Sequence, residues 1–298
     1  MLEHKPRLEG KVAIVTGAGA QGAVMGNGKA ASILFAREGA RVLLVDQVEE
    51  RVQVTLETIR GEGGEASVYV ADVTEADQCR AMVEAAVQRY GRLDVLHNNV
   101  GINGPGSVVD VSLEEWDRVM RINLTSMMLT SKYAIPRMAS GGGGAIVNIS
   151  SISAIRPRGM TSYTVSKAGI VALTQAMAID HAGDNIRVNC ILPGPAYTSM
   201  VAEGMSDEVR DLRRQASPLK IEGTSWDIAW AAVYLASDEA RWTNHRLDRL
   251  PEYHRTLHAS QRHYAHQSEA STQNAVGLCT NTSRYQLECL MSSVDNSP

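Results

Sequence analysis

Short apolar runs alternate with amphipathic stretches along most of the chain. The apolar runs are rich in β-branched residues and predict strands at Val12–Thr16, Arg41–Asp46, 67–71, 93–97, 145–150 and 186–191. The stretches between and after them repeat apolar positions with the period of a helix, and they predict helices at 27–38, 48–60, 75–90, 112–139, 161–181 and 225–237. This alternation is typical of a parallel sheet joined by crossover helices. We therefore expect one α/β domain with a doubly wound parallel sheet.

The pattern ends near Trp242. The segment 243–298 holds 56 residues but only one of the chain's 25 glycines and five of its eight histidines, and Ser, Thr, Asn, Gln and His dominate it. Because it contains no strand-like run of useful length, we expect disorder or loose helix there. The predicted organisation is a globular domain at 8–242, followed by an atypical polar tail at 243–298.

Composition and charge exclude several classes of protein. The hydrophobic fraction of 44% is enough for a buried core, and the net charge of −4 gives no reason to expect nucleic acid or an anionic membrane as a partner. No apolar run approaches membrane-spanning length, and the first residues lack the apolar segment of a signal peptide. Because the four cysteines have neither disulfide nor metal-ligand spacing, we expect no metal site and a reducing, cytoplasmic setting.

A glycine-rich stretch, GAGAQGAVMGNGKAAS, follows the first predicted strand and leads into the first predicted helix. Glycine lets the backbone approach a pyrophosphate closely, and the amides of a helix N-terminus favour negative charge. The favoured phosphate-loop residues are Gly17, Gly26 and Gly28. Gly19 and Gly22 offer an alternative GxGxxG reading with Gly17. The position of the stretch predicts a dinucleotide site in a Rossmann-type sheet.

Asp46 ends the second predicted strand, twenty-nine residues after Gly17. A carboxylate at this place accepts hydrogen bonds from the adenosine ribose and repels a 2′-phosphate. No Lys or Arg lies between Gly17 and Gly28, and Gln47 follows Asp46. These observations favour NAD over NADP, although a solvated carboxylate at a strand end remains the alternative interpretation of Asp46.

Tyr163 and Lys167 lie four residues apart in the stretch SYTVSK. Side chains at this spacing share one face of a helix. A phenol has a pKa of about 10 in water, and a neighbouring cation stabilises its phenolate and lowers that pKa. The pair therefore suits a general acid/base that moves a proton on or off an alcohol oxygen. The same spacing also occurs on ordinary helix faces, so the interpretation depends on the other motifs.

These motifs occur in the order typical of the short-chain dehydrogenase/reductase family, which the chain resembles over about residues 8–242. Thr16 and Gly17, followed by GNG at 26–28, are similar to its TGxxxGxG loop, and NNVG at 98–101 is similar to its NNAG motif. The other matching residues are Asp72, Val73, Asn123, Ser150, Ser151, Tyr163, Lys167, Pro193, Gly194 and Thr198.

The resemblance implies a role for each matching residue. Tyr163 is expected to exchange the proton with the substrate oxygen, Ser151 to hydrogen-bond that oxygen, and Lys167 to lower the pKa of the phenol and bind the nicotinamide ribose. Asn123 is expected to hold a water that links Lys167 to solvent. The implied cofactor-binding residues are Gly17, Gly26, Asn27, Gly28, Asp46, Asp72, Val73, Asn99, Gly101, Tyr163, Lys167, Pro193, Gly194 and Thr198.

The implied activity is the interconversion of a secondary alcohol and a ketone, with hydride transferred to or from NAD(H). The partners expected are therefore a small-molecule alcohol or ketone and a second copy of the chain. The predicted helices 112–139 and 161–181 carry apolar faces where this family forms its dimer contact, so we expect a homodimer or homotetramer. The polar segment 196–216 is expected to form a lid over the substrate.

Two departures from the family pattern concern the site. Gly17 and Gly26 are nine residues apart where the family has four, so the phosphate loop carries five extra residues, which we place before the helix. The interval from Ser151 to Tyr163 is twelve, one shorter than the commonest spacing, whereas Ser150 gives thirteen. Because alternation along a strand points neighbouring side chains in opposite directions, we expect only one serine to serve. We favour Ser151, and Ser150 remains the alternative.

A third departure follows Trp242. The family normally adds a last strand beside the sixth, but the text TNHRLDRLPEYHRTLHASQRH contains no such pattern and resembles a shifted reading frame or a replaced C-terminus. Loss of this strand would expose the backbone of the sixth strand. We therefore expect lowered stability. The alternative function is that of a degenerate NAD-binding member of the family with impaired or no turnover.

Overall fold

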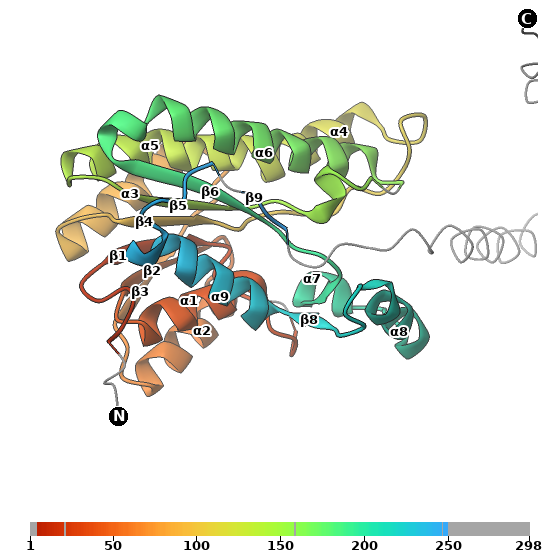
Figure 1. Cartoon of the computed structure of the whole chain (residues 1–298), viewed down its shortest axis with the longest axis horizontal. Helices are drawn as coiled ribbons and strands as arrows, with labels where there is room; N and C mark the ends of the chain where they lie inside the picture. Colours follow the sequence, from red (N-terminus) through yellow and green to blue (C-terminus); the bar gives the residue numbers. More distant parts are fainter. Residues whose placement is uncertain (1–4, 21, 158, 246, 250–298) are drawn as a thin grey trace, which may run out of the picture. The chain divides into compact units, whose positions relative to one another are not determined.

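A parallel sheet of seven strands forms the centre of the fold (Figure 1). The computed structural model describes residues 5–20, 22–157, 159–245 and 247–249, and all of these belong to one compact unit. The strands are β1 (Val12–Thr16), β2 (Arg41–Asp46), β3 (Ala66–Val70), β4 (Val95–Asn98), β5 (Gly144–Ile149), β6 (Ile186–Leu192) and β9 (Leu247–Arg249). Their order is β3-β2-β1-β4-β5-β6-β9, and every pair is parallel. The predicted doubly wound α/β fold is confirmed.

Helices cover both faces of the sheet, which explains why its inner strands are mostly apolar. One layer contains α1 (Asn27–Arg37), α2 (Glu49–Gly61) and α9 (Ser225–Ala236), and the other contains α3 (Ala76–Tyr90), α5 (Ser126–Ser140) and α6 (Thr161–Asp180). Alternation along β1 puts Ala13 and Val15 in the first core and Ile14 in the second. Within the described ranges, no helix combines the length and apolarity needed to cross a membrane.

The start of α1 packs directly against the end of β1. A Cβ atom at Gly28 would lie 2.0 Å from the main-chain oxygen of Gly17 and 2.7 Å from Nδ2 of Asn99. Contacts this short exclude any side chain at Gly28, so glycine is required by packing as well as by any ligand. The helix begins at Asn27, which confirms that the five extra residues of the loop precede it.

The predicted helix 112–139 is wrong as a single element. The structure has α4 (Leu113–Met120), a π-helical turn at Arg121–Thr125, and then α5. A π turn holds one more residue than an α turn, and it shifts the faces of the helix on either side of it. Apolar periodicity cannot predict such a turn, because each flanking helix keeps its own regular pattern. The turn buries Asn123 completely.

The expectation that no strand follows Trp242 is also wrong. β9 pairs with β6 over Cys190–Leu192. Just before it, the main-chain N–H of His245 donates to the carbonyl of Val188 (2.9 Å), and Oδ1 of Asn244 accepts from the Val188 N–H (2.9 Å). Main-chain bonds hold this three-residue edge strand, so it needs no apolar alternation. The premise for lowered stability is removed, whereas the disorder expected from 250 onward lies outside the described residues.

His97 occupies the middle of the sheet as a neutral, packed side chain. It lies in β4 and is fully buried, and its ring packs edge-on against Phe35 of α1, with centroids 5.7 Å apart. Within the described part of the chain neither ring nitrogen has a hydrogen-bond partner. Because burial disfavours the charged imidazolium, the pKa of His97 is lowered from 6.5 to about 3.

Acid should destabilise the protein through His97. The unfolded imidazole takes up a proton below about pH 6.5, but the folded one stays neutral down to its pKa of about 3. The free energy of unfolding is therefore retained above the unfolded pKa and falls as the pH decreases toward the folded one, by up to about 1.4 kcal/mol per pH unit. Urea unfolding near pH 7 and near pH 5 should show a smaller loss for His97→Leu than for the wild type. If the free energy of unfolding fell equally in His97→Leu and in the wild type, His97 would have no part in the acid sensitivity.

Replacing Gly28 should test the packing of α1. Gly28→Ala places a methyl group on the Gly17 carbonyl, and we expect it to lower the free energy of unfolding by about 1–3 kcal/mol. Gly61→Ala is the matched control, since a Cβ at this helical position meets no atom within 4 Å. It should be neutral or stabilising by up to about 1 kcal/mol. Thermal unfolding followed by circular dichroism measures both, and an unchanged Tm for Gly28→Ala would count against the close approach.

Candidate active site

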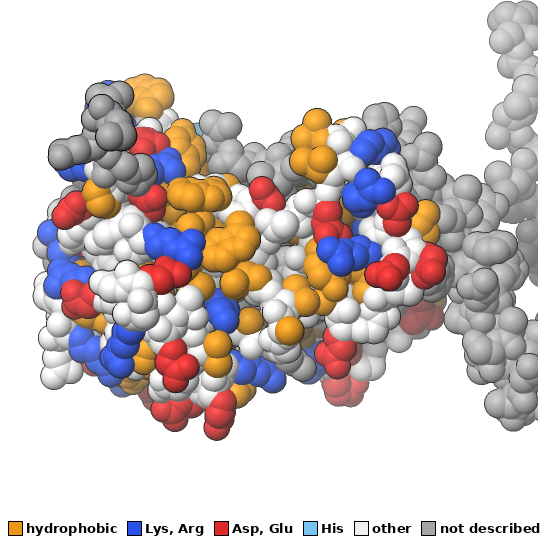
Figure 2. Space-filling view, turned by 90° about the horizontal axis from the view of Figure 1, so that it is seen from below, with side chains coloured by type: hydrophobic (Ala, Val, Ile, Leu, Met, Phe, Trp, Pro, Cys, Tyr) orange, Lys and Arg blue, Asp and Glu red, His pale blue; other side chains and the backbone are white. Residues whose placement is uncertain are grey.

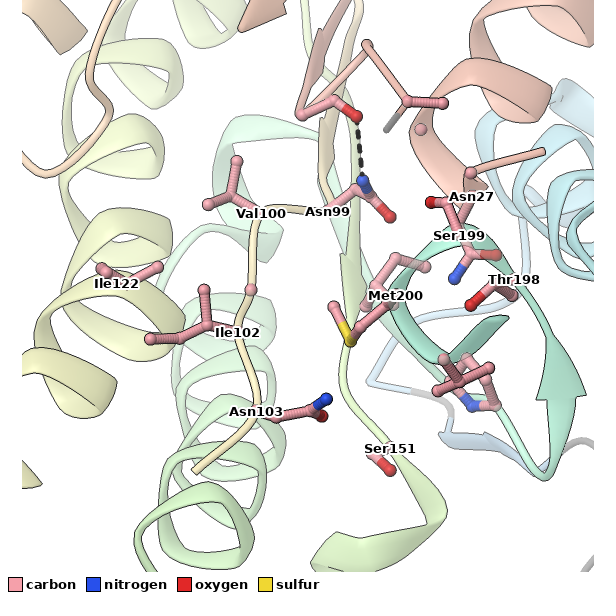
Figure 3. Close-up of a pocket in the computed structure, with 18 of the residues that line it drawn as sticks. Asn27, Asn99, Val100, Ile102, Asn103, Ile122, Ser151, Thr198, Ser199 and Met200 are labelled. Atoms are coloured by element: carbon pink, nitrogen blue, oxygen red, sulfur yellow. Dashed lines mark hydrogen bonds between the residues drawn. The ribbon is translucent and has the colours of Figure 1, made fainter. Parts of the chain in front are cut away.

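A cavity of about 640 Å³ opens at the carboxyl ends of the strands, beside the point where the strand order reverses between β1 and β4. Apart from Asn123, every residue predicted to act in catalysis or cofactor binding lines this cavity. Figure 3 shows Asn99, Val100, Ile102 and Asn103 along one wall, with Asn27, Thr198, Ser199 and Met200 opposite. The site is therefore built from the turns that follow several strands and from one long loop after β6.

The phosphate loop has the features of a dinucleotide site. Gly17 has φ +64°, in the region that favours glycine, and Gly26 precedes the first turn of α1. Oδ1 of Asn27 is buried at this helix start and has no hydrogen-bond partner among the described residues. This oxygen can only accept a hydrogen bond, so it fits a donor such as a ribose hydroxyl or a water. The glycine backbone and the N-terminus of α1 are the features that fit the negatively charged pyrophosphate of NAD(P).

The long phosphate loop contacts both the segment 196–216 and the start of α9. The carbonyl of Met25 accepts hydrogen bonds from the N–H of Ser199 (3.3 Å) and from the hydroxyl of Ser225 (2.8 Å). A Cβ at Gly26 would lie 3.0 Å from Oγ of Ser199, so the backbones approach closely here. Figure 3 shows the side chain of Asn27 beside Ser199. The long loop is thus held against Ser199, within the segment that was predicted to form a lid, and against Ser225.

Asp46 lies at the end of β2 and accepts two main-chain hydrogen bonds. Its Oδ2 binds the N–H of Gly19 at 3.0 Å, and its Oδ1 binds the N–H of Val48 at 3.1 Å. Arg51, in the first turn of α2, lines the same end of the cavity, and its Cβ leaves no room for a side chain at Gly19. Arg51 was not among the predicted site residues, although it lies only five residues beyond the carboxylate.

Asn99 joins the turn after β4 to the phosphate loop. Its N–H donates to Oγ1 of Thr16 (3.1 Å), and its Nδ2 donates to the carbonyl of Gly17 (3.2 Å). In the turn that follows β3, Oδ1 of Asp72 accepts the N–H of Thr74 at 2.8 Å. Both side chains therefore fix the backbone of cavity-lining turns.

Lys167 is a buried cation beside Tyr163. Its Nζ lies 5.7 Å from the centroid of the Tyr163 ring and donates to the carbonyl of Ile149 at 3.0 Å. Lys167 is 3% exposed and Tyr163 is 8% exposed. Burial lowers the pKa of Lys167 from 10.5 to about 8, because the ammonium is removed from water. At pH 7 the lysine still carries its charge and acts on the phenol through a water-poor medium.

Asn123 holds the turn after β4 against α6. Its Oδ1 accepts from the N–H of Ile102 (2.7 Å), and its Nδ2 donates to the carbonyl of Ile102 and to Oγ of Ser166, both at 3.0 Å. A Cβ at Gly101 would lie 3.1 Å from Nζ of Lys167 and 3.4 Å from Oδ1 of Asn123. Glycine therefore keeps open the space between the lysine and the asparagine. The amide itself is engaged with protein groups.

The two serines after β5 have different partners. The strand ends at Ile149, so both lie beyond it and both line the cavity, and the premise of alternating side chains does not apply. The hydroxyl of Ser150 donates to the main-chain carbonyl of Lys167 at 2.7 Å. Oγ of Ser151 accepts from the N–H of Ser153 at 3.1 Å, which leaves its own proton for another acceptor.

The predicted lid segment 196–216 folds as β7 (Ala196–Tyr197), α7 (Ser199–Ala202) and α8 (Asp207–Ala216), and β8 (Gly223–Thr224) pairs with β7. The guanidinium of Arg210 stacks 3.9 Å from the ring centroid of Tyr197 and forms an ion pair with Glu222. The cavity-lining residues that the sequence analysis missed include Asn103, Ser199, Met200, Val201, Glu203 and Arg213. In the sequence, only their position next to predicted motifs indicated that these residues could line the cavity.

Comparisons with known proteins agree with this geometry. The family model described as enoyl-(acyl carrier protein) reductase matches residues 22–245. The 3-oxoacyl-[acyl-carrier-protein] reductase of Thermotoga maritima is 38% identical over 237 residues, which cover 79% of this chain and 94% of the relative. The 7alpha-hydroxysteroid dehydrogenase of Clostridium sardiniense is 39% identical over 238 residues, which cover 78% and 89%.

Solved structures are also similar. A 7 alpha-hydroxysteroid dehydrogenase complexed with NADH and 7-oxo glycochenodeoxycholic acid matches with a TM-score of 0.78 and 34% identity, over 83% of this chain and 94% of that one. Levodione reductase matches with a TM-score of 0.78 and 30% identity, over 82% and 97%. From these relatives, the family model and the cavity geometry it follows that the chain belongs to the short-chain dehydrogenase/reductase family.

Proposed function

We propose that this NAD(P)-dependent oxidoreductase interconverts a secondary alcohol and a ketone, that NAD(H) is its cofactor, and that Tyr163 is its general acid/base. The observation that carries the proposal is the buried ammonium of Lys167, which lies 5.7 Å from the ring centroid of Tyr163 inside the cavity. A cation at this place stabilises the phenolate and so lowers the cost of moving a proton at neutral pH.

The proposed cofactor site runs along the carboxyl ends of the strands. The helix start at Asn27 would hold the pyrophosphate, Asp46 the adenosine ribose, and Asp72 with Val73 the adenine. Pro193, Gly194 and Thr198 would hold the nicotinamide carboxamide. When bound, the nicotinamide supplies the hydride chemistry. The residues of the chain position the two reactants and exclude water from the reacting carbon.

The proton is handled by three side chains in this proposal. During alcohol oxidation, Tyr163 accepts the hydroxyl proton, and Ser151 donates a hydrogen bond to the same oxygen. Lys167 has three N–H groups, and one of them binds the carbonyl of Ile149. The other two would hold the ribose hydroxyls of a bound cofactor and a water that leads to solvent. Because the amide of Asn123 binds Ile102 and Ser166, we assign Asn123 to holding the turn that borders this water.

Relatives named for a hydroxysteroid and for a 3-oxoacyl group support chemistry at a secondary carbon without singling out one substrate. The alternative of a non-catalytic NAD-binding protein rested on a missing last strand, and β9 removes that premise. We retain the alcohol oxidoreductase as the better supported function, in a cytoplasmic setting.

Self-association is supported by apolar side chains on the outer faces of the helices. Ile179 on α6 is 69% exposed and Trp230 on α9 is 46% exposed. Figure 2 shows hydrophobic side chains gathered among charged ones on the face of the α1, α2 and α9 layer, where the guanidinium of Arg37 lies 5.4 Å from the ring centroid of Trp226. Faces of this kind fit a homodimer or homotetramer.

Removing one phenolic oxygen tests the proposed chemistry. Tyr163→Phe should lower kcat for alcohol oxidation by at least about 100-fold, because the general base is lost. Tyr90→Phe is the matched control, since the hydroxyl of Tyr90 donates to Ser67 at 2.8 Å outside the cavity. A panel of steroid, sugar, acyl-chain and cyclic alcohols is assayed with NAD, and cofactor binding is followed by fluorescence quenching. Full turnover by Tyr163→Phe would refute the mechanism.

Removing one charge tests the cofactor preference. The wild type should use NAD at least about tenfold better than NADP in kcat/KM, because the Asp46 carboxylate repels a 2′-phosphate. Asp46→Asn keeps an acceptor for the Gly19 N–H but removes the charge. It should therefore bring kcat/KM with NADP closer to kcat/KM with NAD. Asp77→Asn, which alters a side chain that is 88% exposed on α3, should leave the ratio unchanged. A wild-type preference for NADP would refute the role of Asp46 and would make Arg51 the residue to test next.

A further inference from the structure

Two consecutive residues at the end of β5 bind Lys167, one at its ammonium and the other at its main chain. The main-chain carbonyl of Ile149 accepts from its Nζ at 3.0 Å, and the hydroxyl of Ser150 donates to its main-chain carbonyl at 2.7 Å. All three residues are less than 5% exposed. The lysine side chain is therefore stretched between two fixed points on the same segment, with its main chain at one point and its ammonium at the other.

This arrangement limits the freedom of the ammonium. A lysine side chain has about 2 kcal/mol of rotamer entropy when it is unconstrained, and one hydrogen bond at its tip does not fix where the helix below it lies. The bond from Ser150 fixes that helix to the strand at the residue that carries the ammonium. Tyr163 lies one turn earlier on the same helix. The distance between the ammonium and the phenol is therefore set by how the end of β5 holds α6.

A second hydrogen bond between β5 and α6 lies further along the helix. Nδ2 of Asn148 donates to Oγ1 of Thr174 at 2.9 Å, and this hydroxyl donates to the carbonyl of Ile170 at 2.8 Å. The end of β5 and the inner face of α6 are thus linked at Lys167 and again at Thr174, about two turns further along the helix. Ser150 is the link that lies closest to the reacting groups, because Ser151 is the next residue.

The other groups that face Lys167 are uncharged at neutral pH. Cys190 faces it from β6, and burial raises the pKa of this thiol to about 12. Gly101 approaches its Nζ from the turn after β4, with Asn123 behind it. Tyr163 is therefore the titratable partner on which the position of the ammonium has its effect.

We propose that Ser150 is a positioning residue, whose hydroxyl sets the place of the Lys167 ammonium and thereby the rate of proton transfer by Tyr163. Ser151, the next residue, faces the substrate. This inference rests on the proposed function, in which Tyr163 moves the proton, and it assigns different tasks to the two serines.

The pH dependence of kcat tests the inference. In Ser150→Ala the ammonium is less well placed, so the phenolate is less stable and the pKa of Tyr163 should rise. Alcohol oxidation needs the phenolate, so kcat should fall about 5- to 20-fold near pH 7, since one pKa unit corresponds to about tenfold. The deficit should shrink toward about pH 10, where the phenol loses its proton without help. Ser150→Thr keeps the hydroxyl and should restore most of the rate near pH 7.

Two other serines serve as controls. The hydroxyl of Ser237 donates to the carbonyl of Tyr234 at 2.8 Å, is buried at the end of α9, and lies outside the cavity, so Ser237→Ala should leave the pH profile unchanged. Ser151→Ala should lower kcat by a similar factor at every pH, because it removes a contact with the reacting oxygen. A pH-independent loss in Ser150→Ala, or a profile like that of Ser237→Ala, would overturn the proposal.

A binding measurement tests the inference without turnover. The affinity for NADH, followed by fluorescence from about pH 6 to about pH 10, should weaken as Lys167 loses its proton. In Ser150→Ala the ammonium becomes better hydrated and keeps its proton to higher pH. The pH at which half of the NADH affinity is lost should therefore move upward by at least about half a pH unit. An unchanged midpoint would overturn the proposal. Failure of the proposed function would be seen separately, as full turnover by Tyr163→Phe.

Discussion

A buried positive charge is the constraint on which the site depends. Lys167 is almost fully removed from water, and one strand end holds it through the carbonyl of Ile149 and the hydroxyl of Ser150. A buried cation is costly unless nearby groups compensate, so its surroundings must remain fixed. The turn with Gly101, the thiol of Cys190 and the ring of Tyr163 all lie around this charge. The geometry of the catalytic groups follows from how that charge is accommodated.

Much of the fold could be predicted because its signals are local. The bounds of Val12–Thr16 and Arg41–Asp46 match the predicted strands, since a run of β-branched residues ends there at glycine or at a charged turn. The phosphate loop was recognised because glycine is required where backbones meet, and the clash that a side chain would make at Gly28 is the physical reason. Such features depend on neighbours in the sequence, and the sequence alone is enough to find them.

The remaining features depend on contacts between distant segments. The π turn around Asn123 has no periodic pattern of its own, and its benefit is a bond to a loop that starts at another strand. The different hydrogen-bond partners of Ser150 and Ser151 depend on where the strand stops, which is a matter of one residue. Ser199 lines the cavity, and its N–H donates to the carbonyl of the distant Met25, which nothing near Ser199 in the sequence shows. A single sequence cannot identify which side chains of a loop point into a cavity.

The short strand β9 has a consequence for how the chain tolerates change. It is made of Leu247, Asp248 and Arg249, and it joins β6 through main-chain groups that every non-proline residue possesses. Pairing through the main chain sets no requirement for particular residue types at these three positions. Asn244, just before them, is different, because its Oδ1 takes the place of a main-chain acceptor for the Val188 N–H. Terminal sequences could therefore diverge within the outermost strand itself, whereas a change at Asn244 would remove a bond at the far border of the sheet.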